Sequence, residues 1–414
     1  MTNIFYGIPS ESNIRNNIDK WINVAGTPEV FSAKDEDLHK YQTKLLGKYD
    51  VISLDEALKR YPSVDVWVTY RKADNTGKML LTKIPPEKIH FLEADLEYRR
   101  GCNFLGRHLF YRQNNFSPCC ISGKCPIIQT SGTISQRLTQ WKDDVTKLID
   151  DIRNEKPNKC QNCHLLNYGF WHKSVKLSVL GFLQDLPGDE CNFNCVYCFA
   201  RKKLDRLKDD DEGLTTCDII RQLSEMPELD TEDFAIRLAN GEFCVNKYCD
   251  EMLDIFSKTK WKIVLRSNCS IYKEKLATLM ESGRIRELLT SLDAGTRETF
   301  KKIKQVDCFD KVVENLRKYP LDKTRFLLKY IFLEGLNDNE TDVDGFYEIA
   351  KEIKAIIMFS ADYKTNATPY TKKMRELTLR IINKAKADSI KIHPDNGYLN
   401  PQDAKFIKEY LTQN

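Results

Sequence analysis

The chain has 414 residues, a length at which two or three domains are expected. Lysine and arginine number 64 against 60 aspartate and glutamate, so the net charge of +4 gives no basic field of the kind that dedicated nucleic-acid binders carry. Hydrophobic residues make up 41% and charged residues 30%, which is typical of packed globular domains and excludes a disordered or fibrous chain.

Neither a membrane segment nor an export signal is predicted. The longest apolar runs, such as Ala355 to Phe359, are far shorter than the ~20 residues that span a bilayer. The start, Met1 to Ser10, lacks the basic, apolar and small-residue regions of a secretory signal. We therefore expect a cytoplasmic protein with no membrane and no nucleic-acid partner.

Residues 1–97 alternate short strands with helices. Strand-like segments and helical patterns follow one another at Asn3 to Tyr6, Ile14 to Val24, Pro28 to Phe31, Tyr49 to Ile52, Leu54 to Arg60 and Val64 to Tyr70. This spacing predicts a small Rossmann-like α/β domain with a parallel sheet. The phosphate-binding pattern G-x-G-x-x-G is absent, so a docking or substrate-presenting role is favoured over dinucleotide binding.

Residues 98–175 form a cysteine-rich segment with one amphipathic helix, Leu138 to Ile152. Its six cysteines are Cys102, Cys119, Cys120, Cys125, Cys160 and Cys163. Clustered cysteines in a long intracellular chain favour metal ligands over disulfides. We therefore predict that a metal replaces part of a hydrophobic core here.

Residues 176–414 return to a regular α/β rhythm. Six strands are predicted, each followed by a helical pattern, at Leu177 to Phe182, Phe234 to Leu238, Lys262 to Arg266, Leu288 to Leu292, Phe326 to Phe332 and Ala355 to Phe359. Six consecutive βα units predict a partial (β/α)6 TIM-type barrel, followed by C-terminal helices. Functional residues are then expected at the C-terminal ends of the strands.

A cysteine triplet follows the first strand of this barrel. Cys191, Cys195 and Cys198 have the spacing C-x3-C-x2-C within GDECNFNCVYCFA. Three thiolates on one short loop can each bind one iron of a cubane cluster, which leaves the fourth iron open. A structural zinc site is a poorer match, because the loop offers no fourth thiolate or histidine.

The triplet resembles the signature of the radical S-adenosylmethionine (SAM) superfamily, in which an aromatic residue, here Tyr197, precedes the last cysteine. The resemblance implies that Cys191, Cys195 and Cys198 are catalytic ligands of a [4Fe–4S] cluster whose open iron chelates SAM. It also implies that an external donor of the flavodoxin or ferredoxin type reduces the cluster, and that a 5'-deoxyadenosyl radical then abstracts hydrogen from a substrate.

Further strand ends resemble the SAM-binding segments of that superfamily. The positions that the resemblance assigns to SAM binding, besides Tyr197, are Asn240, Gly241, Glu242, Ser267, Ser291, Asp293, Gly335 and Asn337. Asn240-Gly241-Glu242 is similar to the GGE motif, with asparagine in place of the first glycine. The resemblance implies that Asn240-Gly241-Glu242 binds the methionine end of SAM. It implies that Ser291 and Asp293 lie near the ribose or carboxylate of SAM, and that Gly335 and Asn337 lie on its adenine side.

The second cysteine group resembles the auxiliary-cluster segments of the SPASM and twitch families, although it precedes the barrel here. The implied ligands are Cys160 and Cys163, with Cys119 or Cys120 and one of Cys102 and Cys125. A second iron–sulfur cluster, a tetrathiolate zinc site and free thiols all remain open at this point.

The substrate prediction depends on analogy. The N-terminal α/β segment is similar to small domains of sugar-pathway proteins, so we expect a small-molecule or glycan substrate: oxidation, dehydrogenation or epimerisation of a carbohydrate or nucleotide-sugar. The alternatives are a peptide-modifying enzyme of ribosomal peptide maturation and a non-catalytic iron–sulfur protein for scaffolding or electron transfer.

Overall fold

The computed structural model of this chain describes residues 2–7, 11–33, 45–69, 79–92, 95–112, 115–119, 131–163, 165–182, 186, 189–198, 214–362 and 367–412. The chain folds into two compact units. The N-terminal unit comprises Met1–Arg107 and Lys142–Lys176, and the barrel unit comprises His108–Cys120, Ile127–Trp141 and Leu177–Asn414.

The N-terminal unit contains a five-stranded parallel sheet in the order β3-β2-β1-β4-β5. Its elements are β1 (Asn3–Tyr6), α1 (Glu11–Ala25), β2 (Val30–Ala33), β3 (Val51–Ser53), α2 (Leu54–Arg60), β4 (Asp65–Val68) and β5 (Ile89–Phe91). Successive side chains of β1 point to opposite faces, so Ile4 packs into one apolar cluster and Phe5 into another. Both faces are therefore covered, which confirms the predicted Rossmann-like α/β fold.

The cysteine-rich segment supplies elements to both units. In the N-terminal unit, β6 (Leu96–Gly101) pairs antiparallel with β9 (Asn167–His172). In the barrel unit, β7 (His108–Arg112) pairs with β8 (Asn115–Ser117). Helix α4 (Ile134–Arg153) continues from one unit into the other and includes the predicted helix. A separate role for residues 98–175 stays a prediction.

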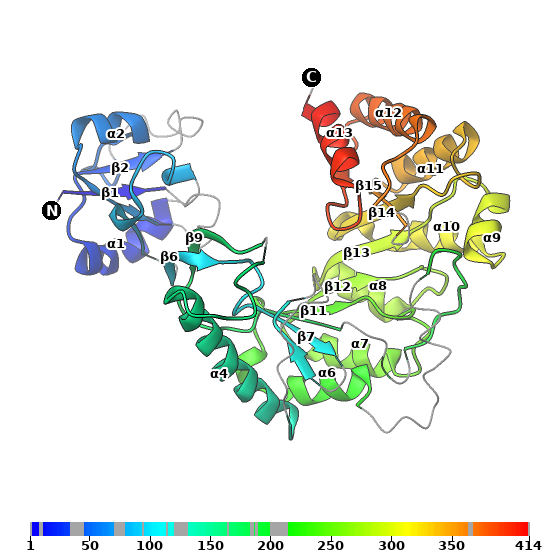
Figure 1. Cartoon of the computed structure of the whole chain (residues 1–414), viewed down its shortest axis with the longest axis horizontal. Coiled ribbons are helices and arrows are strands. Elements are labelled where there is room, and N and C mark those ends of the chain that lie inside the picture. Colours follow the sequence, from blue (N-terminus) through cyan, green and yellow to red (C-terminus); the bar gives the residue numbers. More distant parts are fainter. Residues whose placement is uncertain are drawn as a thin grey trace. The chain divides into compact units, whose positions relative to one another are not determined.

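The barrel unit contains a nine-stranded sheet in the order β16-β15-β14-β13-β12-β11-β10-β7-β8, in which every pair except β7–β8 is parallel. Its further strands are β10 (Val179–Phe182), β11 (Ala235–Leu238), β12 (Lys262–Arg266), β13 (Ile285–Ser291), β14 (Arg325–Ile331), β15 (Ile356–Ser360) and β16 (Ile392–Pro394). Strands β10 to β15 neighbour one another in chain order, as the predicted partial barrel requires, and β11 to β15 can be followed in Figure 1.

Helices alternate with these strands, and one more helix follows the last strand. They are α6 (Thr216–Ser224), α7 (Cys249–Lys258), α8 (Glu274–Glu281), α9 (Arg297–Lys304), α10 (Phe309–Lys318), α11 (Glu340–Glu352), α12 (Lys372–Ala387) and α13 (Pro401–Thr412). Each parallel pair needs such a crossover, which fixes one direction for all strands. The carboxyl ends of β10 to β15 therefore meet at one edge of the sheet.

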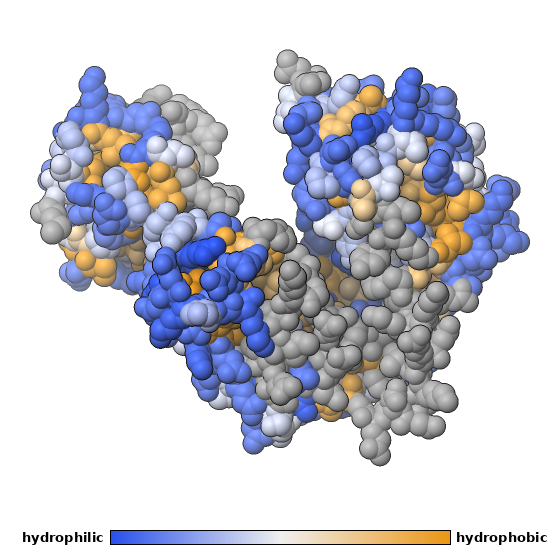
Figure 2. Space-filling model, in the orientation of Figure 1, coloured by the Kyte–Doolittle hydropathy of each residue, from blue (hydrophilic) through white to orange (hydrophobic). Residues whose placement is uncertain are grey.

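The inner face of the sheet carries a small apolar layer. Leu289 on β13, Leu327 on β14 and Met358 on β15 pack together there and are 7%, 2% and 8% exposed. On the side of the barrel unit that Figure 2 shows, the described residues are mostly hydrophilic, with apolar patches between them. Within the part of the chain that the structure describes, no helix is long and apolar enough to cross a membrane.

Candidate functional site

The loop that carries the cysteine triplet is held by backbone hydrogen bonds. The N–H of Asn194 donates to the carbonyl of Lys304, and the N–H of Val196 donates to the carbonyl of Ile303, each at 3.0 Å. Both acceptors belong to the last turn of α9, where helix carbonyls lack intrahelical partners. Because the last turn of α9 accepts these bonds, the loop has a fixed path over the ends of the strands.

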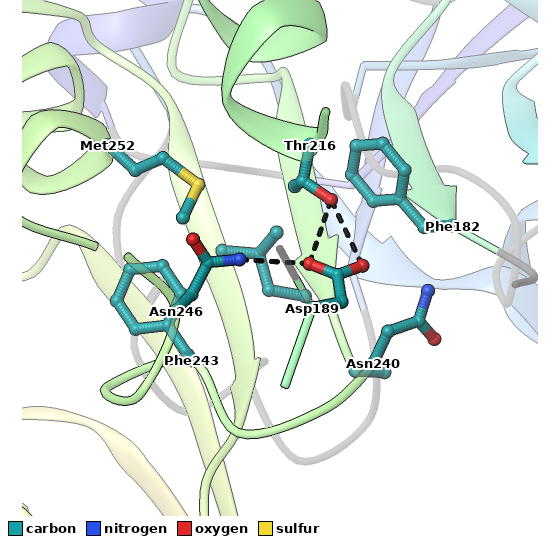
Figure 3. A pocket seen from close by; sticks show the side chains of 9 residues that line it. Phe182, Asp189, Thr216, Asn240, Phe243, Asn246 and Met252 are labelled. Carbon is teal, nitrogen blue, oxygen red and sulfur yellow. Dashed lines mark hydrogen bonds between the residues drawn. The ribbon is translucent and has the colours of Figure 1, made fainter. Parts of the chain in front are cut away.

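Asp189 fixes the beginning of this loop. Its carboxylate accepts hydrogen bonds from Thr216 Oγ1 at 3.1 and 3.2 Å, from Asn246 Nδ2 at 3.0 Å and from the N–H of Leu186 at 3.0 Å. Figure 3 shows this carboxylate between Thr216 of α6 and Asn246, with Asn240 beside it. A buried carboxylate with several donors is a stable anchor, so Asp189 ties the cysteine loop to the segment after β11.

A cavity of about 140 Å³ opens at the carboxyl ends of the strands. Its walls bring together predicted residues from four separate segments, namely Cys191, Cys195, Tyr197, Gly241, Glu242, Ser267 and Ser291. Five further side chains complete the lining together with Leu289: Phe193, Arg266, Asn268, Lys304 and Lys329. The predicted residues Cys198, Asn240, Asp293, Gly335 and Asn337 are not part of this wall.

Glu242 presents a buried carboxylate to the cavity and is 2% exposed. It accepts hydrogen bonds from Ser267 Oγ at 2.7 Å, from the N–H of Asn268 at 2.5 Å and from the N–H of Cys244 at 3.2 Å. Burial raises the pKa of Glu242, and these hydrogen bonds oppose that rise. The carboxylate is therefore fixed in one orientation, which suits the recognition of a cationic amine.

Gly241 allows the loop after β11 to approach the cysteine loop. Its φ is +53°, and a Cβ there would lie 2.5 Å from the carbonyl oxygen of Glu190. The N–H of Glu242 donates to that same oxygen at 2.6 Å. Only glycine combines this backbone conformation with this contact, so Gly241 joins the two loops directly.

Lys304, Asp293 and Tyr197 form a buried ionic cluster beside the cysteine loop, which the sequence analysis did not predict. Lys304 Nζ lies 2.5 Å from Asp293 Oδ2 and 2.7 Å from the Tyr197 hydroxyl, which donates to the same carboxylate oxygen at 2.5 Å. Lys304 is 1% and Asp293 0% exposed. Burial, followed by the charge of Asp293, raises the pKa of Tyr197 well above its usual value, so the phenol stays protonated. Tyr197 thereby joins the cysteine loop to this ion pair.

Asp293 and Asn337 do not line the cavity, and their side chains bind other groups of the protein. The resemblance implied that they contact SAM. The second carboxylate oxygen of Asp293 accepts the N–H of Ile331 at 2.8 Å. Asn337 donates to the carbonyls of Asp293 and Ile331, each at 2.8 Å, and is fully buried. Gly335 has φ +74° in the turn before Asn337. These residues stabilise the ends of β13 and β14.

The comparison with known families decides the class of this site. The Radical SAM superfamily matches residues 186–346, which include the cysteine loop and the strand ends around the cavity. Residues 186–346 form a radical SAM domain. Such a domain implies a [4Fe–4S] cluster and SAM, and radical SAM enzymes act on small-molecule or peptide substrates with an external reductant.

Curated relatives match part of the chain at low identity. GTP 3',8-cyclase of Clostridium perfringens (strain SM101 / Type A) is 25% identical over 154 residues, which is 37% of this chain and 46% of that protein. Molybdenum cofactor biosynthesis protein moc-5 of Caenorhabditis elegans is 26% identical over 176 residues, 41% of this chain and 28% of that protein. The chain thus matches less than half the length of these relatives.

Solved structures are similar to this chain at still lower sequence identity. Streptococcus suis SuiB bound to S-adenosylmethionine has a TM-score of 0.40 and 10% identity, covering 67% of this chain and 55% of that one. A radical SAM methyltransferase from Sphaerobacter thermophilus has a TM-score of 0.34 and 15% identity, covering 50% of this chain and 63% of that one.

The donors of the radical SAM domain suit an iron–sulfur cluster. Cys191 is exposed and Cys195 partly buried at the cavity. Desolvation raises the pKa of Cys191 to about 11, and that of Cys195 rises for the same reason although the Lys304 ammonium opposes it. Thiols that are protonated in the metal-free chain release protons when metal binds. No group of three His, Cys, Asp or Glu residues among the described residues is placed for a single metal ion.

The second cysteine group is described only in part. Cys160 and Cys163 form one turn, in which the N–H of Cys163 donates to the carbonyl of Cys160 at 3.0 Å. Burial raises the pKa of Cys102, and the charge of Cys163 acts in the same direction, so the two thiols interact electrostatically within the N-terminal unit. Cys119 belongs to the barrel unit. Cys120 and Cys125 lie outside the described residues.

Proposed function

We propose that Cys191, Cys195 and Cys198 bind the [4Fe–4S] cluster and that the adjoining cavity binds SAM. The observation that carries the proposal is that two of these cysteines share one cavity with Tyr197, Glu242 and the ends of three parallel strands. When bound, the reduced cluster supplies the electron that cleaves SAM to methionine and a 5'-deoxyadenosyl radical, which takes a hydrogen atom from the substrate.

The protein positions these groups. The Glu242 carboxylate, with its three hydrogen bonds, is proposed to accept the amino group of SAM, while Asn240 and Gly241 shape the loop that carries it. Ser291 is proposed to face the ribose or the carboxylate, since it lines the same cavity. Asp293 and Asn337 are proposed as positioning residues, because their polar atoms bind other protein groups.

The proposed substrate is a small molecule, a carbohydrate or nucleotide-sugar that loses hydrogen in an oxidation or epimerisation. A nucleotide substrate is also supported, because the relatives named above include a GTP 3',8-cyclase. A peptide substrate is the competing outcome, and assays with each substrate class decide between them.

The cysteine-rich segment is proposed to hold a second iron–sulfur cluster. The electrostatic interaction between Cys102 and Cys163, and the turn that Cys163 shares with Cys160, support a shared site in the N-terminal unit. A bound zinc ion would instead make the segment structural. Metal analysis of the purified chain separates these possibilities.

The test of the proposed function is SAM cleavage by the full chain, loaded with iron and sulfide anaerobically and reduced with dithionite. We expect 5'-deoxyadenosine from the parent chain and none above background from Cys191→Ala, because two thiolates do not retain the cluster. Cys308→Ala is the matched control, since Cys308 is an isolated cysteine before α10. Equal product from Cys191→Ala and Cys308→Ala would disprove the assignment.

A further inference from the structure

The cavity has a polar layer directly above the apolar layer of the inner sheet face. Residues two apart on a strand share a face, so Ser291 follows Leu289 on β13 and Lys329 follows Leu327 on β14. Ser291 and Lys329 are register partners in the β13–β14 pair. Arg266, at the end of β12, is the partner of Leu289. Two cationic side chains therefore reach one cavity from strands on either side of β13.

Neither of these cations has an anionic partner in the described part of the chain. No ion pair or hydrogen bond is found there for the Arg266 guanidinium or for the Lys329 ammonium. The third cation of the cavity differs, since Lys304 is held by Asp293 and Tyr197. Among the described residues, the side chains of Arg266 and Lys329 thus have no protein partner, so a ligand can supply their counter-charge.

The two carboxylates whose charges act on Lys329, those of Asp293 and Asp395, are already engaged. Asp293 accepts hydrogen bonds from Lys304, Tyr197 and the N–H of Ile331. Asp395 accepts from Ser360 Oγ at 2.8 Å and from the N–H of Gly397 at 3.2 Å. Burial lowers the pKa of Lys329 first of all, and the charges of Arg266 and Lys304 lower it further against the opposing effect of these two carboxylates.

An uncompensated charge in a partly desolvated place destabilises a fold. Lys329 sits half-buried next to Leu327 and has a second cation within electrostatic range, so packing alone would favour an apolar side chain there. Unfavourable charges of this kind are typical of binding sites, where a ligand supplies the counter-charge.

We infer that Arg266 and Lys329 form an oxyanion subsite that binds a phosphate or carboxylate group of the substrate. The inference rests on the proposed function of the cavity and narrows its substrate class to anionic molecules. An arginine guanidinium offers paired N–H groups that match two oxygens of such a group, and a lysine ammonium adds a point charge beside it.

SAM has a carboxylate of its own, and that group is the main competitor for the two cations. One carboxylate carries a single negative charge, which one cation balances. The inference therefore assigns at least one of Arg266 and Lys329 to a group that SAM does not carry.

The experiment is calorimetric titration of the anaerobic, cluster-loaded full chain, with SAM already bound, using inorganic pyrophosphate and citrate as probes. The variants are Arg266→Gln and Lys329→Met. The matched controls are Arg286→Gln, an exposed arginine at the other end of β13, and Lys302→Met, an exposed lysine of α9. SAM affinity is titrated separately for every variant, and 5'-deoxyadenosine production is measured in the parent chain.

At least one probe is expected to bind the parent chain, and each cavity variant is expected to weaken it roughly tenfold to a hundredfold, the usual effect of losing a charge-assisted hydrogen bond. The control variants are expected to leave probe affinity within about threefold of the parent. Lys329→Met is also expected to raise the melting temperature of the metal-free chain, because it removes an uncompensated charge.

Three results would overturn the inference: no binding of either probe, equal loss in the cavity and control variants, or a loss of SAM affinity in both cavity variants as large as the loss of probe affinity. The last result would assign both cations to the SAM carboxylate. Failure of the proposed function would look different, since the parent chain would then produce no 5'-deoxyadenosine whatever the probes do.

Discussion

The buried ion pair beneath the cysteine loop gives the sharpest prediction, for the substitution Lys304→Met. Lys304 Nζ contacts Asp293 Oδ2 at 2.5 Å and the Tyr197 hydroxyl at 2.7 Å, and both charged groups are at most 1% exposed. Methionine keeps most of the side-chain volume and removes only the charge and the donor. The Asp293 carboxylate would then remain buried without its cation.

Breaking a buried pair in this way costs about 3–5 kcal/mol of folding free energy, because the remaining charge is uncompensated. Solvent screening, which reduces surface pairs to about 0–1 kcal/mol, does not apply to groups this deeply buried. The double variant Asp293→Asn/Lys304→Met removes the stranded charge, so we expect it to recover at least half of the loss. Asparagine also tolerates the positive φ of +58° at this position.

The measurement is urea unfolding of the full metal-free chain under reducing conditions, followed by tryptophan fluorescence. Lys302→Met is the matched control, because Lys302 lies on the same helix, is exposed and should change stability by less than about 0.5 kcal/mol. If Lys304→Met unfolds within about 1 kcal/mol of Lys302→Met, the ion pair does not stabilise this loop and the reasoning fails.

Two further predictions concern the loop after β11. Gly241→Ala places a Cβ 2.5 Å from the Glu190 carbonyl oxygen, whereas the control Gly283→Ala has a similar φ of +67° and no atom within 4 Å of its Cβ. We therefore expect Gly241→Ala to lower the free energy of unfolding in urea by about 1–3 kcal/mol more than Gly283→Ala, and to weaken SAM binding. Equal losses of stability in the two variants would refute the contact. Glu242→Gln keeps the acceptor for Ser267 but removes the charge, and calorimetry should show SAM affinity reduced roughly tenfold to a hundredfold. Unchanged affinity would exclude Glu242 as the amine acceptor.

The helices and strands whose bounds were predicted best are determined by residues close to them in the sequence. Helix α2 begins and ends at the predicted residues, Leu54 and Arg60. Ser53 caps its first turn by accepting the N–H of Glu56, and acidic residues at the start and basic residues at the end complement the helix dipole. These determinants lie within a few residues of one another, so the sequence alone contains them.

Nonlocal pairing accounts for what was missed. The hairpin β7–β8 lies in the cysteine-rich segment, and its strand β7 extends the barrel sheet by pairing with β10. Nothing in the residues 108–112 indicates which strand they join, because the pairing partner lies about 70 residues further along the chain. Lys304 was missed for the same reason, since RETFKKIK reads as an ordinary basic helix end until Asp293 is placed beside it.

The candidate site shows how far a strand pattern can predict function. Polar residues at the ends of apolar strands, such as Ser267 and Ser291, are visible in the sequence, and the partial barrel brings them to one edge. Their roles depend on pairing that only the fold supplies. Asp293 is neutralised by Lys304, whereas Lys329, one strand away, has no such partner among the described residues. Asp293, just after β13, and Lys329, within β14, thus differ in use: one stabilises the loop that carries the cysteines, and the other has no counter-charge among the described residues.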